Sequence, residues 1–163
     1  MPNRSTAIHR GAERRKFAQS SLRDKAYMLA MMGSQALCQS VLPVVHTKKL
    51  SKGADRLAKI YRRSPLPRPR AEKIIERAEI VKNLQLWRAE CVAESLVLWT
   101  CLRAGDHPAV LRVGCRNIFG HVEAHMWVEL DGKPLLDIDN EYETWQAFDE
   151  DFAAAAVNAN ATR

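Results

Sequence analysis

The stretch CVAESLVLWTCLRAGDHPAVLRVGCRN, residues 91–117, decides the fold. After Cys91, apolar residues occupy most of the circumference of a helix, and such a helix belongs in the middle of a core. Gly105 is a suitable C-terminal stop for it, and PAVLRVGCR is typical of a strand that Pro108 starts. We therefore expect a buried helix from Cys91 to Gly105 that leads directly into a sheet.

Two further strands follow. HVEAHMWVEL (121–130) and KPLLDID (133–139) flank an Asp131-Gly132 turn, which predicts an antiparallel hairpin. The order is a buried helix and then a meander, so the sequence indicates an α+β fold and not a βαβ unit.

Residues 1–70 look helical and basic. We expect a disordered basic arm over 1–20, a helical N-terminal region over 21–70 and the catalytic core over 71–163. Ser21 with Asp24 is typical of a helix start, and Pro43 ends that helix. Ser51 is expected to cap a second short helix. SPLPRPR (64–70) cannot be helical, and a third helix is expected over 71–86.

Composition and charge restrict the class of protein. The chain has 163 residues and 47% hydrophobic residues, enough for one compact domain with a core. It has no apolar run long enough to cross a membrane and no signal peptide, so we expect a cytoplasmic protein that does not bind membranes. Its four cysteines lack CxxC spacing, which argues against a disulfide framework and a zinc site.

The charge is unevenly distributed. Residues 1–70 hold 16 Lys and Arg against 3 Asp and Glu, a net charge of +13, whereas residues 71–163 hold 9 against 16, a net charge of −7. The basic part is expected to dock an acidic partner or to serve as a solvated tail. Nothing supports specific nucleic-acid binding, because a Gly-rich phosphate loop and a basic motif interleaved with aromatic residues are both missing.

Cys91 is the candidate nucleophile. It falls in the first turn of the buried helix, where unpaired N–H groups and the helix dipole favour a thiolate and can hold an oxyanion. Glu90 and Glu94 oppose that charge. The other cysteines, Cys38, Cys101 and Cys115, lack this placement and are expected to be small apolar residues.

The hairpin supplies a base and an acid, depending on its register. A two-residue Asp131-Gly132 turn would place His125 opposite Ile138, with Asp137 on the other face. A three-residue loop, a type I turn with Gly132 at a bulge, would place His125 opposite Asp137. That register leaves one face wholly apolar, so we expect burial to select it.

Cys91, His125 and Asp137 thus form a candidate catalytic triad, in which His125 deprotonates the thiol and Asp137 orients the imidazole. The alternative is a structural His–Asp pair. His121 is a rival base that more plausibly lines the cleft or is exposed, and Asp139 is a weaker rival acid. Trp127 shares the face of His125 and could wall the site, so Trp127 and His121 are candidate substrate contacts. We expect no metal and no cofactor.

These residues resemble a known family. Residues 71–140 are similar to the transglutaminase-like B proteins of lasso-peptide biosynthesis, the leader peptidases. The motif residues that carry the resemblance are Cys91, Ser95, Gly105, Gly114, Ala124-His125, Trp127-Val128-Glu129, Gly132, Leu135 and Asp137. The resemblance implies a transglutaminase/papain-like core and a triad of Cys91, His125 and Asp137.

The implied reaction is removal of the leader from a ribosomally made precursor peptide through a thioester. Because residues 1–70 contain no strand-rich segment, we expect the split form of the family. That form implies a separate leader-recognition protein, and a separate ATP-dependent lasso cyclase that takes the product. Two alternatives remain open: another acyl transfer by the same triad, such as transamidation, and a non-catalytic module that binds the leader or a partner.

Overall fold

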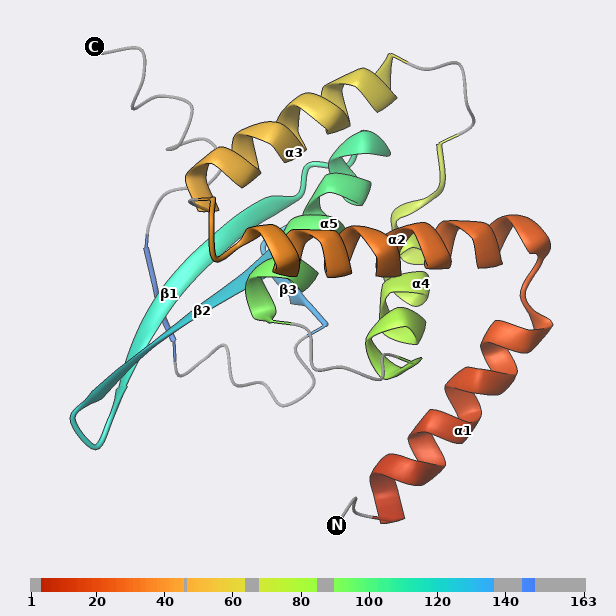
Figure 1. Cartoon of the computed structure of the whole chain (residues 1–163), viewed down its shortest axis with the longest axis horizontal. Coiled ribbons are helices and arrows are strands. Elements are labelled where there is room, and N and C mark those ends of the chain that lie inside the picture. Colours follow the sequence, from red (N-terminus) through yellow and green to blue (C-terminus); the bar gives the residue numbers. More distant parts are fainter. Residues whose placement is uncertain (1–3, 46, 64–67, 85–89, 137–144, 149–163) are drawn as a thin grey trace.

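A computed structural model describes residues 4–45, 47–63, 68–84, 90–136 and 145–148. These residues form helices followed by a small antiparallel sheet (Figure 1). The elements are α1 (Arg4–Gln19), α2 (Leu22–Val41), α3 (Thr47–Arg62), α4 (Ala71–Leu84), α5 (Cys91–Ala104), β1 (Val110–Ile118), β2 (His121–Leu130), β3 (Lys133–Leu135) and β4 (Gln146–Ala147).

Helix α5 is the centre of the molecule, as its apolar circumference predicts. It contacts α2, α3, α4 and both long strands, and Figure 1 shows these elements around it. Trp99 and Leu102 are almost completely buried, and the Trp99 indole N–H donates to the carbonyl of Ala109 at the start of the sheet (3.1 Å). The expected buried helix and the α+β fold are therefore confirmed.

The sheet has the strand order β3-β2-β1-β4. Strands β1 and β2 pair along their whole length, from Val110 opposite Glu129 to Ile118 opposite His121. Their hairpin projects beyond the helices, at the lower left of Figure 1. The predicted meander is confirmed, and β4, which the sequence did not predict, adds a short fourth strand against β1.

The predicted register of the second hairpin is wrong. Leu130 pairs with Lys133 and Val128 with Leu135, which is the register of a two-residue turn. Asp131 (φ 52°) and Gly132 (φ 73°) both adopt the left-handed conformation, and a type I′ turn requires this of both residues. Its twist matches that of the strands, and it buries Leu135 beside Val128. A type I turn with a bulge is therefore unnecessary.

The N-terminal helices differ in part from expectation. Ser21 caps α2 as predicted, because its Oγ accepts from the Asp24 N–H at 3.1 Å. Ser51, however, does not cap α3: the helix begins at Thr47, and Ser51 is buried inside it. None of the described helices is long and apolar enough to cross a membrane.

The basic arm is not disordered where the structure describes it. Residues 4–19 form α1, which packs against α4. Phe17 lies against the hydrophobic core, and the nearly buried Glu13 accepts from Lys16 Nζ at 2.8 Å. That hydrogen bond is the main reason why the pKa of Lys16 lies above its usual value. Packing therefore holds a helix that composition alone does not predict.

A polar cluster joins α2 to α4. The nearly buried Arg77 donates through Nε to Asp24 at 3.0 Å, and its guanidinium lies 4.5 Å from the Tyr27 ring centroid. Hydrogen bonds from Ser21 and then Arg77 lower the pKa of Asp24. The cluster therefore ties α4 to the first turns of α2.

Candidate active site

Cys91 is the first residue of α5, so its predicted place at the helix start is confirmed. The residue before it, Glu90, has extended backbone angles and no side-chain capping bond. The N–H groups of Ala93 and Glu94 bond the Glu90 carbonyl, whereas those of Cys91 and Val92 have no acceptor within the helix by geometry. The partly exposed thiol therefore lies where a helix favours negative charge.

Glu94, one turn after Cys91, is a partly buried acidic neighbour of the thiol. Burial raises the pKa of Glu94, and the charge of Lys82 at the end of α4 only partly offsets this. Its negative charge opposes a thiolate at Cys91, as the sequence suggests.

Ser95 ties the start of α5 to β2. Its hydroxyl is buried and donates to the backbone carbonyl of Met126 at 2.8 Å. Met126 follows His125 directly, and Cys91 lies one turn, about 6 Å along the axis, before Ser95. This bond fixes the start of α5 to β2 at the residue that follows His125.

Strand β2 divides its residues between two faces. Met126 and Val128 belong to the hydrophobic core with α5, so His125 and Trp127, which alternate with them, face the other side. The predicted apolar face therefore holds for Met126 and Val128 of β2, but β3 contributes Leu135 to it and not Pro134. Because α5 packs on the Met126 and Val128 face, His125 faces away from the helix that carries Cys91, and the approach of its imidazole to the thiol stays a prediction.

His125 lies between two indole rings. Its ring centroid is 6.1 Å from that of Trp127, with 17° between the planes, and 5.0 Å from that of Trp145, with 29°. Trp145 lies immediately before β4 and is a residue that sequence reasoning missed. A two-residue strand has no periodicity that could have indicated it.

Trp127 is held firmly. Its Nε1 donates to Glu129 at 3.0 Å, and Glu129 also accepts from Arg112 at 3.0 Å. The indole covers Gly114, because a Cβ built there would lie 2.8 Å from the ring. Trp127 is 5% exposed, so it forms a wall beside His125, and its contact with a substrate stays a prediction.

Asp137 lies outside the described residues, as does Asp139. The pairing of β2 with β3 extends only to Leu135, opposite Val128, and Leu136 has a left-handed backbone (φ 62°) that interrupts the strand. The predicted direct pairing of Asp137 with His125 therefore has no support from the hairpin register. Lys82 donates to the Leu136 carbonyl at 2.9 Å, which places the chain just before Asp137 against the end of α4.

His121 is exposed at the start of β2. It is four residues, about 13 Å along the strand, from His125. Exposure is one of the two placements that the sequence predicts for His121. Its contact with a substrate stays a prediction. Among the described residues, no group of three or more His, Cys, Asp or Glu is arranged to hold a metal ion.

The other cysteines differ from Cys91. All four are free thiols. Burial raises the pKa of Cys38 and Cys101, which suppresses their thiolate forms. Cys115 lies within β1, paired with Ala124 and Gln146. Only Cys91 combines partial exposure with a helix start.

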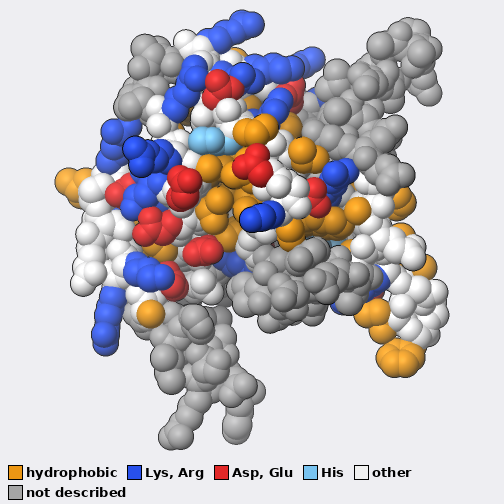
Figure 2. All heavy atoms as spheres, turned by 180° about the vertical axis from the view of Figure 1, so that it is seen from behind, with side chains coloured by type: hydrophobic (Ala, Val, Ile, Leu, Met, Phe, Trp, Pro, Cys, Tyr) orange, Lys and Arg blue, Asp and Glu red, His pale blue; other side chains and the backbone are white. Residues whose placement is uncertain are grey.

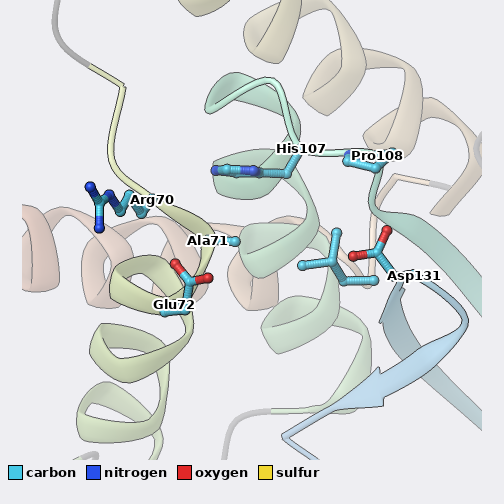
Figure 3. A pocket seen from close by; sticks show the side chains of 7 residues that line it. Arg70, Ala71, Glu72, His107, Pro108 and Asp131 are labelled. Atoms are coloured by element: carbon cyan, nitrogen blue, oxygen red, sulfur yellow. The ribbon is translucent and has the colours of Figure 1, made fainter.

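A shallow hollow lies at the opposite end of α5. It encloses about 510 Å³ and is lined by Arg70, Ala71, Glu72, His107, Pro108, Leu130 and Asp131. In Figure 3 these side chains surround the end of α5 and the β2–β3 turn. None of the predicted site residues lines it, so the candidate site and this hollow are separate.

Comparison with known proteins agrees with this arrangement. A family model described as the transglutaminase-like superfamily matches residues 41–150, about two thirds of the chain. The match includes Cys91, His125 and Asp137. Comparisons with curated proteins and with solved structures gave no match. With an α+β domain and a family match over more than half its length, the chain belongs to the transglutaminase-like superfamily.

Proposed function

We propose that this protein is a cysteine peptidase that removes the leader from a lasso-peptide precursor. Membership of the transglutaminase-like superfamily supports cysteine-protease or acyltransferase chemistry. The observation that supports the proposal further is the bond from Ser95 to Met126, which ties the start of α5 to the residue that follows His125. The finer assignment to lasso peptides rests on the ordered motif from Cys91 to Asp137.

In the proposed reaction, His125 takes the proton of the Cys91 thiol and the sulfur attacks the carbonyl carbon of the scissile peptide bond. The N–H groups at the start of α5 hold the oxyanion. The carbon–nitrogen bond then breaks, His125 protonates the amine of the core peptide, and the leader stays on Cys91 as a thioester. Water, deprotonated by His125, hydrolyses the thioester and restores the thiol.

Asp137 is proposed to orient the imidazole and to stabilise its charged form. The place of Leu136, held by Lys82 near the start of α5, supports this role, because the next residue is Asp137. With the hairpin register corrected, Asp137 would reach His125 through the chain reversal after β3 and not by direct cross-strand pairing. The chemistry requires no cofactor.

The proposed partners are the precursor peptide, a separate leader-recognition protein and the lasso cyclase, all in the cytoplasm. The exposed basic face of α3 supports an acidic partner. Lys49, Arg56 and Arg63 are exposed there, beside Leu57 and Ile60, which are 54% and 64% exposed. Figure 2 shows Lys and Arg side chains along the upper edge, where α3 lies in Figure 1. If an acidic partner binds this face of α3, its affinity should fall as the salt concentration rises. An affinity that does not change between low and moderate salt would contradict this binding by charge.

Cleavage of the cognate precursor by the Cys91→Ala variant tests the proposal. We expect at least a thousandfold loss, because the nucleophile is removed, and we expect iodoacetamide to label Cys91 before the other thiols. Cys115→Ala is the matched control and should cleave normally. Full cleavage by Cys91→Ala would refute the proposal.

Transamidation is the second candidate, because the superfamily match supports acyl transfer in general. Adding a primary amine to the reaction separates the two. A free carboxylate at the end of the released leader supports hydrolysis, whereas a stable amide adduct supports transamidation. A non-catalytic module would bind the precursor equally well after Cys91 is alkylated and would not cleave it.

A further inference from the structure

We propose that Trp145 is a positioning residue for His125. Its indole, brought in by β4, closes one side of an aromatic sandwich that fixes the plane of the imidazole. The catalytic consequence rests on the proposed function, whereas the effect on the imidazole itself does not.

The sheet register explains how Trp145 reaches this place. Strand β4 pairs with β1 through Ala147 opposite Gly114 and Gln146 opposite Cys115. One further step along this register brings Trp145 to Arg116, and the Arg116 guanidinium lies 4.2 Å from the centroid of the Trp145 ring. Arg116 therefore holds the indole by a cation–π contact.

Gly114 allows the ring to cross β1. On the other side of that strand, Gly114 pairs directly with His125. With no side chain between them, Trp145 and His125 stack across the middle strand at 5.0 Å. A Cβ at this position would lie 2.8 Å from the Gln146 carbonyl and 2.8 Å from the Trp127 ring, so the gap is needed by the Trp127 ring and by the backbone of β4 that follows Trp145.

The sandwich has two effects on the imidazole. Rings on both faces restrict its rotation and leave the ring edge, with its two nitrogens, to exchange protons. Indole faces also favour the imidazolium form. The charged side chains on this face pair with one another: Arg112 with Glu129 and Arg116 with Glu123.

Three variants of the full chain test the proposal. Trp145→Leu removes the aromatic face, Trp145→Phe keeps a ring, and Phe148→Leu is a control on the same segment. Phe148 is 57% exposed, and its backbone N–H donates to the Val113 carbonyl at 2.9 Å. Circular dichroism and thermal unfolding check that each variant folds.

The first readout is the NMR titration of the His125 imidazole, which requires no substrate. We expect Trp145→Leu to move its midpoint to lower pH by about 0.4–0.7 pH unit. Trp145→Phe should move it less, and Phe148→Leu should leave it unchanged. The second readout is cleavage of the cognate precursor, where Trp145→Leu should lower kcat at least about tenfold with KM unchanged.

The outcomes separate the two proposals. An unchanged His125 midpoint in Trp145→Leu overturns the positioning role, whatever the activity. If the wild-type protein does not cleave the precursor, the proposed function fails, and the titration alone decides the role of Trp145. If Trp145→Leu does not fold, Arg116→Gln decides: a smaller shift in the same direction supports the proposal, and no shift overturns it.

Discussion

The two ends of α5 are built differently. At its C-terminal end, the Gly105 N–H bonds the Cys101 carbonyl at 3.0 Å and the His107 N–H bonds that of Leu102 at 3.0 Å. Asp106 forms ion pairs with Arg62 and Arg68 from the segments that cross this end. At this end the carbonyl groups of Cys101 and Leu102 thus accept hydrogen bonds from the residues that follow the helix.

At its N-terminal end, the same helix starts abruptly with Cys91. The Glu90 side chain does not cap it, the thiol is partly exposed, and one buried hydrogen bond from Ser95 ties this end to β2. The described contacts thus anchor the C-terminal end, whereas at the N-terminal end the N–H groups of Cys91 and Val92 have no acceptor within the helix. Substitutions at the two ends should therefore have different effects.

The largest effect is expected for Ser95→Ala. It leaves the buried Met126 carbonyl without its donor, which costs about 1–3 kcal/mol of the free energy of unfolding, and it frees the helix end from β2. Cleavage of the precursor should fall together with stability. Chemical denaturation and a cleavage assay measure the two effects. Loss of stability with full activity would show that this bond does not position the site.

A smaller effect of opposite sign is expected for Glu94→Gln. Burial raises the folded pKa of Glu94 above its ordinary value of 4.5. Below that value the carboxyl is protonated in both the folded and the unfolded protein, so it does not lower the free energy of unfolding. As the pH rises from there through the folded pKa, ionisation favours the unfolded chain, and stability is lost.

The variant should therefore unfold at a higher temperature than the wild type at about pH 7, and the difference should shrink at about pH 4. Thermal unfolding of both proteins at the two pH values measures this. An equal difference at both pH values would contradict the account of Glu94.

The smallest effect is expected for Asp106→Asn, at the anchored end. The Asp106 side chain is 40% exposed, so water screens both ion pairs, and their loss should cost only about 0–1 kcal/mol. Cleavage should be unchanged, because the substitution lies at the far end of α5. A loss of activity as large as that of Ser95→Ala would remove the distinction between the two ends.

Local signals predicted most of the fold. The apolar circumference after Cys91, the stop at Gly105 and the Asp131-Gly132 turn each act within a few residues, so they are visible in one sequence. The hairpin register was not predicted correctly, because it depended on a choice between two turns. That choice was settled by the left-handed conformation of Asp131, which Asp tolerates.

Features set by distant contacts were not predicted. Helix α1 depends on packing of Phe17 against the core, and Ser51 lies inside α3 because the helix starts at Thr47, five residues before the Lys52 start that its sequence suggests. Trp145 belongs to the site only because a two-residue strand returns it to β1. The sequence identified Cys91 and His125 as candidates but not the aromatic ring stacked on the imidazole.

The most direct test of the central claim is the intact mass of the enzyme after rapid acid quenching of its reaction with the cognate precursor. The account predicts a transient adduct equal to the leader acyl group, located by peptide mapping to Cys91 and missing in the Cys91→Ala variant. Precursor cleavage with an adduct on another residue, or cleavage that persists without Cys91, would contradict it.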